Sequence, residues 1–257
     1  MSSKAEKIPE YLKLLLDRYP NFSNDAIIIG SIGIKINGFQ SDNDHANVCV
    51  NQCRVAWEML NSIHCVIAYD YGLASASLCR NLFEMVIGTI FLIENPAKLR
   101  DFIDYGKVVA YEVLEATPGT DPKYLQAFRL KADYDNLKKR FGREQWHGKS
   151  IRALADACGM KVLYDSFYKE CSAIVHGDAF VTLSYKGGAW GLSRDIHGWS
   201  SYCDMAMDFS YTAMAALYHR AVHRLKLPFE LDVHALMGRL MQKGLYQEQM
   251  EATKRRT

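Results

Sequence analysis

Apolar residues recur at three- and four-residue spacing through most of the segment from about Ser41 to Glu94. This spacing places them on one face of an α-helix, and it predicts two long helices separated by a break at Gly72. The first is expected to end near Tyr69 and the second to start near Ser75. Only six prolines and 17 glycines occur in 257 residues, which favours such long helices over a turn-rich β architecture.

Further helices are expected at residues 9–19, 98–116, 120–141, 150–158, 162–176, 199–226 and 232–254. The apolar run Ala26–Gly30 is too short for periodicity to separate a strand from a helix. Residues 177–198 lack helical periodicity and contain a Gly-Gly turn typical of a hairpin or an ordered loop. The sequence therefore predicts an all-α protein with a single helical bundle at residues 41–226. A helical N-terminal extension at 1–40 and a C-terminal helix with a basic tail at 227–257 complete the chain.

Two local signals define the helix expected at residues 98–116. Asn95 and Pro96 match a helix N-cap followed by a first-turn proline. The apolar side chains expected to point inward are Phe102, Val109, Val113 and Leu114. The helix should therefore turn that face toward the core.

The composition is that of an ordinary soluble globular protein, with 49% hydrophobic and 23% charged residues and a net charge of +2. Such a chain is too apolar to be disordered or of low complexity. The longest apolar stretch, Met85–Ile93, is about half as long as a membrane-spanning helix, and the N-terminus lacks the features of a secretory signal. We therefore expect a cytoplasmic protein without membrane contact.

Seven cysteines are scattered through apolar helical contexts, which is typical of free thiols in a reducing compartment and predicts no structural disulfide. Cys49 and Cys53 could share a helix face with His45. A zinc site there would need a fourth ligand and usually a tighter C-x2-C spacing. Buried core cysteines are the favoured interpretation.

Arg80 and Glu84 stand four residues apart at the start of the most apolar helix, so their side chains can pair directly. Burying a carboxylate among apolar neighbours is costly unless it is paired. Two interpretations stay open. The pair is either a structural ion pair or a pre-organised charged pair at the bottom of a polar cleft.

Tyr168, Ser172 and His176 follow one another at four-residue intervals and would share one stripe of a helix. His176 falls at the expected helix C-terminus, where the helix dipole favours the protonated ring, and Gly177 allows a left-handed exit. A histidine that titrates near neutral pH, with a hydroxyl one turn away, can act as an acid or a base. The alternative is a histidine that caps the helix and holds the following loop.

Residues 129–161 contain nine Lys or Arg and four Asp or Glu, a local charge of +5 with Trp146 and His147 interleaved. A basic stripe with an aromatic residue can bind phosphate or RNA, although a solvated helix face has the same pattern. The sequence contains no phosphate-binding glycine loop, no H-E-x-x-H and no G-x-S-x-G. Kinases, Rossmann oxidoreductases and α/β-hydrolases therefore fit poorly.

Four blocks recur in a familiar order: Arg80-x-x-x-Glu84, Glu94-Asn-Pro-x-x-x-Arg100-x-Phe102-x-x-Tyr105, Trp146-x-Gly148-x-Ser150-Ile-Arg152, and Tyr164-x-x-x-Tyr168-x-x-x-Ser172-x-x-x-His176-Gly177. Together they resemble the microbial family catalogued as domain of unknown function 5677. The resemblance covers roughly residues 45–225. It implies a helical fold and carries no activity.

That family is in turn similar to the HEPN superfamily (higher eukaryote and prokaryote nucleotide-binding domains), in which an Arg/Glu helix faces a helix that ends in His. Many HEPN proteins are metal-independent RNases of toxin–antitoxin and phage-defence systems, with an R-x4-6-H motif acting across a dimer. Here Cys171 stands five residues before His176, so the arginine would be Arg80. The resemblance implies a HEPN-like core, a homodimer, RNA as substrate, a partner protein from the same operon, and no metal or other cofactor.

Two main function classes follow. In the first, a defence or toxin–antitoxin RNase has the catalytic residues Arg80, Glu84, Ser172 and His176. Its binding residues are Tyr105, Trp146, His147, Lys149, Arg152, Tyr168 and Asp178. In the second, a non-catalytic helical module binds a protein, a nucleotide or another ligand, and the same four residues form a structural polar network. A metal-dependent hydrolase would use Glu84, His176 and Asp178 with Glu112 or Glu115, but the Glu-x-x-His pair of ferritin-like bundles does not occur.

Overall fold

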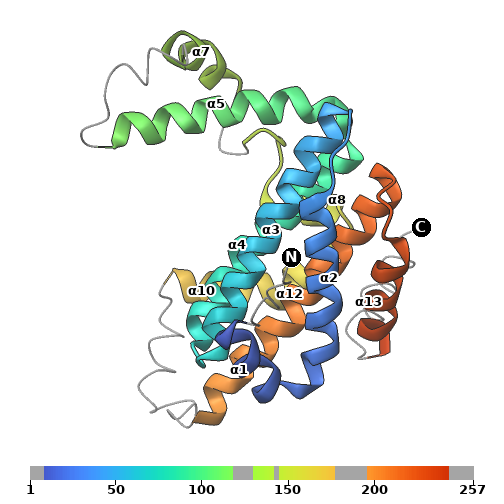
Figure 1. Cartoon of the computed structure of the whole chain (residues 1–257). Coiled ribbons are helices and arrows are strands. Elements are labelled where there is room, and N and C mark those ends of the chain that lie inside the picture. The colour runs from blue at the N-terminus through green and yellow to red at the C-terminus, as the bar shows by residue number, and fades with distance from the viewer. Residues whose placement is uncertain (1–8, 118–129, 142–144, 177–195, 243–257) are drawn as a thin grey trace, which may run out of the picture.

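The computed structural model describes residues 9–117, 130–141, 145–176 and 196–242, which form an all-α bundle without a strand (Figure 1). The predicted fold class is therefore confirmed. The helices are α1 (Glu10–Arg18), α2 (Ser23–Gly38), α3 (Asp44–Ala68), α4 (Gly72–Glu94), α5 (Leu99–Ala116), α7 (Leu130–Leu137), α8 (Ile151–Ala157), α9 (Lys161–Leu163), α10 (Lys169–Val175), α12 (Ile196–Leu225) and α13 (Glu230–Gln242). The expected hairpin or loop at 177–198 lies almost wholly outside the described residues.

Helix α4 is the centre of the bundle, packed between α3 and α12. Its apolar side chains Leu82, Phe83 and Val86 are fully buried, as are Tyr211 and Tyr218 of α12. By length and composition α4 could cross a membrane, but most of it is buried inside the bundle. That burial is typical of the core helix of a soluble protein.

The ambiguous run Ala26–Gly30 is helical and belongs to α2. Ile29, Ile32 and Ile36 are all fully buried, and their spacing extends the helical pattern beyond the short run. Gly33 lies on the same helix where Trp57 of α3 crosses it. A Cβ atom at Gly33 would come within 2.5 Å of the Trp57 ring, so glycine sets this close helix contact.

The two segments expected to flank the core pack against each other, because α13 lies along α2. Arg239 Nε donates to Asp25 Oδ1 at 2.6 Å, and Lys35 Nζ lies 2.6 Å from Asp232 Oδ2. The Asp25 side chain is fully buried. Burying this carboxylate is tolerated because the Arg239 guanidinium pairs with it. Helices α2 and α13 are thereby fixed to one another.

Helix α5 leaves the bundle as an arm, and α7 folds back along it (Figure 1). Asp104 of α5 ties this helix to the 3-10 turn that follows α7 (Lys138–Arg140). Its side chain is 1% exposed and accepts hydrogen bonds from Arg100 Nε at 3.0 Å and Arg140 Nη1 at 2.9 Å. Burial alone would raise the pKa of Asp104, but these arginines outweigh it and hold the pKa below its ordinary value. A charged cluster therefore joins the two helices of the arm.

One expectation for α5 is wrong. Val109 and Val113 are 38% and 59% exposed, while Asp104, Val108 and Tyr111 are the buried side chains. The helix has apolar residues on two faces, and α7 covers the one that carries Asp104. Asn95 and Pro96 take the expected N-cap and first-turn positions, at the 3-10 turn Pro96–Lys98 that leads into α5. The Asn95 side chain makes no cap hydrogen bond, because its amide donates to the Phe91 carbonyl of α4 at 2.8 Å.

The helix expected at 162–176 contains a π-helical turn at Tyr164–Tyr168, between α9 and α10. Its widened hydrogen bond runs from the Lys169 N–H to the Tyr164 carbonyl. The extra residue in the π-helical turn changes which side chains of α10 face the core.

Earlier in the chain, Ser150 caps α8 by accepting a hydrogen bond from the Ala153 N–H, and Gly159 has a positive φ of 70°.

Candidate functional site

Arg80, Glu84 and Tyr168 form one polar network between α4 and the π-helical turn. Arg80 Nη2 lies 2.8 Å from Glu84 Oε1, and the Tyr168 hydroxyl donates to the same oxygen at 2.6 Å. The guanidinium also lies 5.6 Å from the centre of the Tyr168 ring, within range of a cation–π interaction. The pairing expected from the four-residue spacing of Arg80 and Glu84 is therefore present, with Tyr168 as a third partner.

Tyr168 is the donor that completes this network. Its burial, together with the hydrogen bond to Glu84 and the charge of that carboxylate, raises the pKa of the Tyr168 hydroxyl. The hydroxyl therefore stays protonated at neutral pH and donates. Arg80 Nε is buried without a hydrogen-bond partner among the described residues. One donor of the guanidinium is consequently unused.

Glu84 also lines a pocket with a volume of about 360 Å³ in the angle between the bundle and the arm. Helices α3 and α4 provide two walls, Phe102 of α5 a third, and the turn before α8 the last. The lining residues are Gln52, Met59, Asn81, Glu84, Met85, Gly88, Thr89, Leu92, Phe102, Gln145, Trp146, His147 and Ile151. The polar network is therefore connected to a concave surface.

The pocket lining mixes polar and apolar side chains. Glu84 is its only Asp or Glu, the amides of Gln52, Asn81 and Gln145 add donors and acceptors, and no Lys or Arg belongs to its described lining. Methionine and aromatic side chains supply an apolar surface between these groups. Such a lining suits a small neutral or cationic molecule that can donate hydrogen bonds to a carboxylate.

Trp146 and His147, expected to contact a ligand, are only 7% and 6% exposed. The Trp146 ring packs edge-on against Phe102, with centroids 5.1 Å apart, and tilted against Phe91 at 5.9 Å. His147 Nδ1 accepts from the Lys149 N–H at 3.2 Å, so the neutral ring carries its proton on Nε2. Both residues shape the pocket wall while lying mostly in the core.

Ser172 and His176 are not joined to the Arg80–Glu84–Tyr168 network. Ser172 is half-buried on α10, and His176 is exposed immediately after that helix. Among the described residues, neither forms a hydrogen bond or an ion pair with Arg80 or Glu84. The structure therefore brings together two of the four residues expected to be catalytic.

The remaining expected binding residues lie apart from the network. Tyr105 packs edge-on against Phe141 with centroids 5.5 Å apart. Lys149 lies 6.0 Å from the centre of the Phe91 ring. Arg152 is exposed on α8. Asp178 falls outside the described residues.

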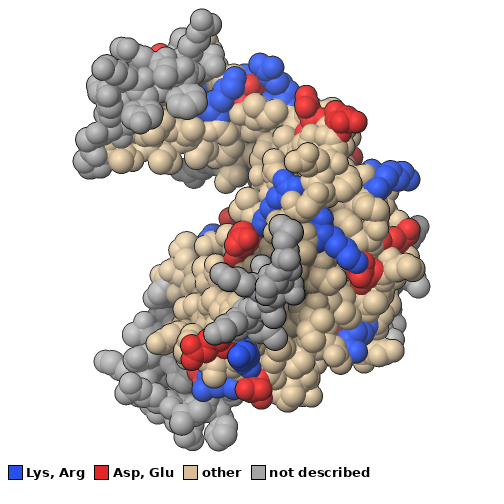
Figure 2. All heavy atoms as spheres, viewed as in Figure 1, with Lys and Arg blue, Asp and Glu red and all other residues tan. Residues whose placement is uncertain are grey.

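Much of the positive charge expected at 129–161 is neutralised locally. Lys138 Nζ lies 3.3 Å from Glu112 Oε1, Arg140 pairs with Asp104 and with Asp101, and Lys161 pairs with Asp165. Figure 2 shows acidic and basic side chains interspersed on the face in view. Arg129 and Arg143 lie outside the described residues. Lys138, Arg140 and Lys161 are therefore neutralised, whereas Lys139, Lys149 and Arg152 form no ion pair with a described residue.

The cysteines behave as core residues. All seven are free thiols. Burial raises the pKa of Cys49 to about 12, and His45 Nε2 lies 2.8 Å from the Leu92 carbonyl oxygen. The favoured interpretation of His45, Cys49 and Cys53 as core residues agrees with this geometry.

Sequence reasoning missed two histidine arrangements. His64 is buried in the core, with its Nε2 3.0 Å from the Tyr211 hydroxyl oxygen, 147 residues away in the chain. His223 and His234 meet at the junction of α12 and α13. On each helix, histidine or glutamate recurs at a spacing of four residues, which puts these side chains on one face. The sequence does not show that the two faces meet, so the arrangement is found only in the structure.

A family model described as "Family of unknown function (DUF5677)" matches residues 46–187, from α3 to beyond α10. The match covers more than half of the chain and confirms the resemblance carried by the Arg80, Trp146 and His176 blocks. No curated protein and no solved structure matches the chain.

Proposed function

Because this chain belongs to a family of unknown function (DUF5677), we propose its function from its own geometry: it is a helical binding module for a small, polar, neutral or cationic molecule. The observation that carries the proposal is the lining of the pocket beside Glu84, with one carboxylate, three side-chain amides, one imidazole (His147) and no Lys or Arg among its described members. Its volume of about 360 Å³ is within the usual range of small-molecule sites.

The state of Arg80 supports a non-catalytic role. Its guanidinium is already paired with Glu84 at 2.8 Å, and Tyr168 donates to the same carboxylate oxygen. A phosphate at Arg80 would have to compete with this carboxylate. The network is therefore best explained as the fixed polar wall of a binding site.

The test is a thermal-shift screen of purified protein with amines, amides and nucleosides, set against nucleotides and other anions. We expect neutral or cationic compounds to raise the melting temperature, since a ligand at 100 times its Kd adds about 2.7 kcal/mol of stability. Gly88→Leu should abolish the shift, because the new side chain would occupy the pocket. Gly106→Leu is the matched control, since a Cβ at Gly106 meets no atom within 4 Å.

Two results would contradict this proposal. One is a screen in which only anions stabilise the protein. The other is a stabilising compound that acts equally on wild type and on Gly88→Leu. The melting temperatures without ligand show whether both variants are folded.

A second candidate is the HEPN-like RNase of a bacterial defence or toxin–antitoxin system, with a partner protein from the same operon. It is favoured by the exposed ring of His176, two turns along the helix from Tyr168, and by the unused Nε of Arg80. In this mechanism His176 would exchange a proton with the ribose hydroxyl or the leaving oxygen, and Arg80 would stabilise the charged phosphate.

Induced expression in a bacterial host tests this candidate. If wild type arrests growth and fragments RNA while folded His176→Ala does neither, the RNase is supported and the non-catalytic proposal fails. RNA could also stay intact because a partner protein is needed or because one inhibits the chain. If RNA stays intact both with and without the proteins that co-purify with the chain, the RNase is rejected.

We also propose a cytoplasmic homodimer. The seven free cysteines support a reducing compartment. The outward face of α5 supports self-association, because Ile103, Val109 and Val113 expose apolar side chains along it.

A further inference from the structure

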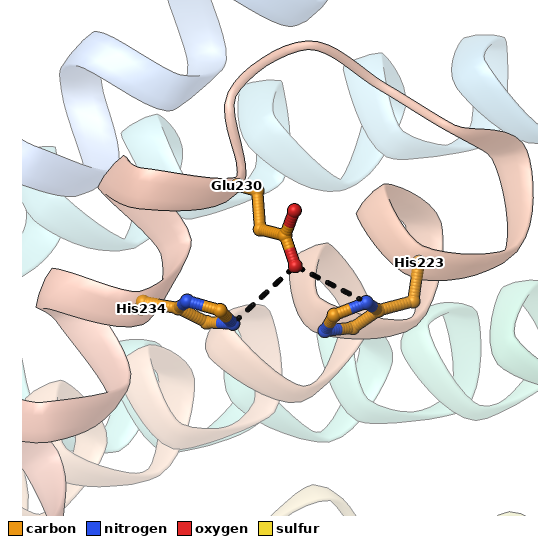
Figure 3. Close-up of side chains that lie close together, drawn as sticks. All are labelled: His223, Glu230 and His234. Carbon is orange, nitrogen blue, oxygen red and sulfur yellow. Dashed lines mark ion pairs between the residues drawn. The ribbon is translucent and has the colours of Figure 1, made fainter.

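His223, Glu230 and His234 converge at the junction of α12 and α13 (Figure 3). Glu230 Oε1 lies 3.5 Å from His223 Nδ1 and 3.8 Å from His234 Nε2, and all three potential ligand atoms lie within 4.8 Å of one another. We propose that these three side chains bind one divalent transition-metal ion of the zinc class, which fastens the first turn of α13 to the last turns of α12.

The spacing fits such an ion. Zinc binds imidazole nitrogen and carboxylate oxygen at about 2.0–2.1 Å, so neighbouring ligands in a tetrahedral site lie about 3.3 Å apart. The two measured separations from Glu230 exceed this value by only a few tenths of an ångström. The two imidazole nitrogens lie within 4.8 Å of one another, so side-chain rotations that draw them together would bring all three atoms to one ion.

The ligand types select the metal. Two imidazoles and one carboxylate suit Zn²⁺ and its transition-metal neighbours, whereas Mg²⁺ and Ca²⁺ prefer oxygen ligands only. All three side chains are about half exposed, so solvent can reach the ion and a water can complete its coordination. This arrangement has three protein ligands and an open position.

The backbone around the cluster is held in place before any metal binds. The link between the two helices buries Leu227 and Phe229, each 4% exposed, and the Leu227 N–H donates to the Val222 carbonyl at 3.2 Å. Glu230 and His234 are one turn apart on α13, so their side chains lie on the same face. The ligands therefore come from fixed positions, which reduces the ordering needed for binding.

A bound ion would link elements that are distant in the chain. Helix α13 packs on α2 through the Asp25–Arg239 pair. Fastening α13 to α12 would therefore also stabilise the position of α2. The metal site is independent of the pocket beside Glu84, so either proposal can fail alone.

The experiment is a titration of the metal-free full-length chain with ZnCl₂, read by competition with a chromogenic chelator and by thermal unfolding. We expect one Zn²⁺ per chain and a higher melting temperature. Glu230→Gln and His234→Ala should each weaken binding at least about tenfold and remove the thermal shift. Glu58→Gln, which makes the same change as Glu230→Gln at an exposed position of α3 outside the cluster, is the matched control and should bind like wild type.

Melting curves in EDTA separate binding from folding, because these exposed substitutions should leave the metal-free melting temperature unchanged. Absence of stoichiometric binding in wild type would overturn the proposal. So would equal affinity in Glu230→Gln, His234→Ala and wild type, or an equal loss in Glu58→Gln.

Discussion

At the scale of single residues, His64 links stability to pH. Burial lowers its pKa from 6.5 to about 4, so the folded protein keeps the ring neutral. The contribution of neutral His64 to the free energy of unfolding is complete above pH 6.5, where the ring is neutral in both the folded and the unfolded protein. This contribution is lost as the pH falls toward 4, because over that range only the unfolded chain takes up the proton. We expect a loss of about 2 kcal/mol by pH 5 and about 3 kcal/mol by pH 4.

Urea unfolding between pH 7 and pH 4 measures this effect. His64→Gln keeps a polar partner for Tyr211 and does not titrate, so its free energy of unfolding should fall less over the same range. If the free energy of unfolding falls equally with pH in wild type and His64→Gln, other groups cause the acid sensitivity.

At the scale of secondary-structure elements, the crossing of α2 and α3 depends on Gly33. A Cβ there would lie 2.5 Å from a Trp57 ring atom, so Gly33→Ala should destabilise the protein by roughly 1–3 kcal/mol through overpacking. Gly30→Ala, one turn away, places its Cβ at an ordinary 3.7 Å and should gain roughly 0.5–1 kcal/mol of helix stability. Urea denaturation of the pair separates the two effects, and equal stabilities would mean that Trp57 moves aside.

The elements also show how far the sequence predicts the site. Arg80 and Glu84 could be paired in advance because four residues on one helix bring them together. The contact between Glu84 and Tyr168 spans 84 positions and depends on how α10 packs on α4. The buried face of α5 was mistaken because Val109 and Val113 have the spacing of a core stripe, while paired arginines make the burial of Asp104 acceptable. The spacing of apolar residues alone does not show that paired arginines offset the cost of burying a carboxylate.

At the scale of the whole molecule, we propose that the homodimer uses the arm as its interface. Ile103 and Val113 are ten residues apart, so their stripe extends about 15 Å along α5. Two such stripes can pack antiparallel around a two-fold axis, each covering the other. We expect a dimer by light scattering and a monomer for Val113→Lys. Ile34→Lys, at a 71% exposed position on α2, should remain dimeric; dissociation of both variants, or of neither, would reject this interface.

The π-helical turn at Tyr164–Tyr168 has a consequence for comparing relatives of this chain. Such a turn is equivalent to one residue inserted into a regular helix. Deleting one residue there would rotate everything that follows by about 100°, the angle between successive residues of an α-helix. The side chain aligned with Tyr168 would then point away from Glu84. A single gap in an alignment at this place would therefore mark relatives whose carboxylate has lost its tyrosine partner.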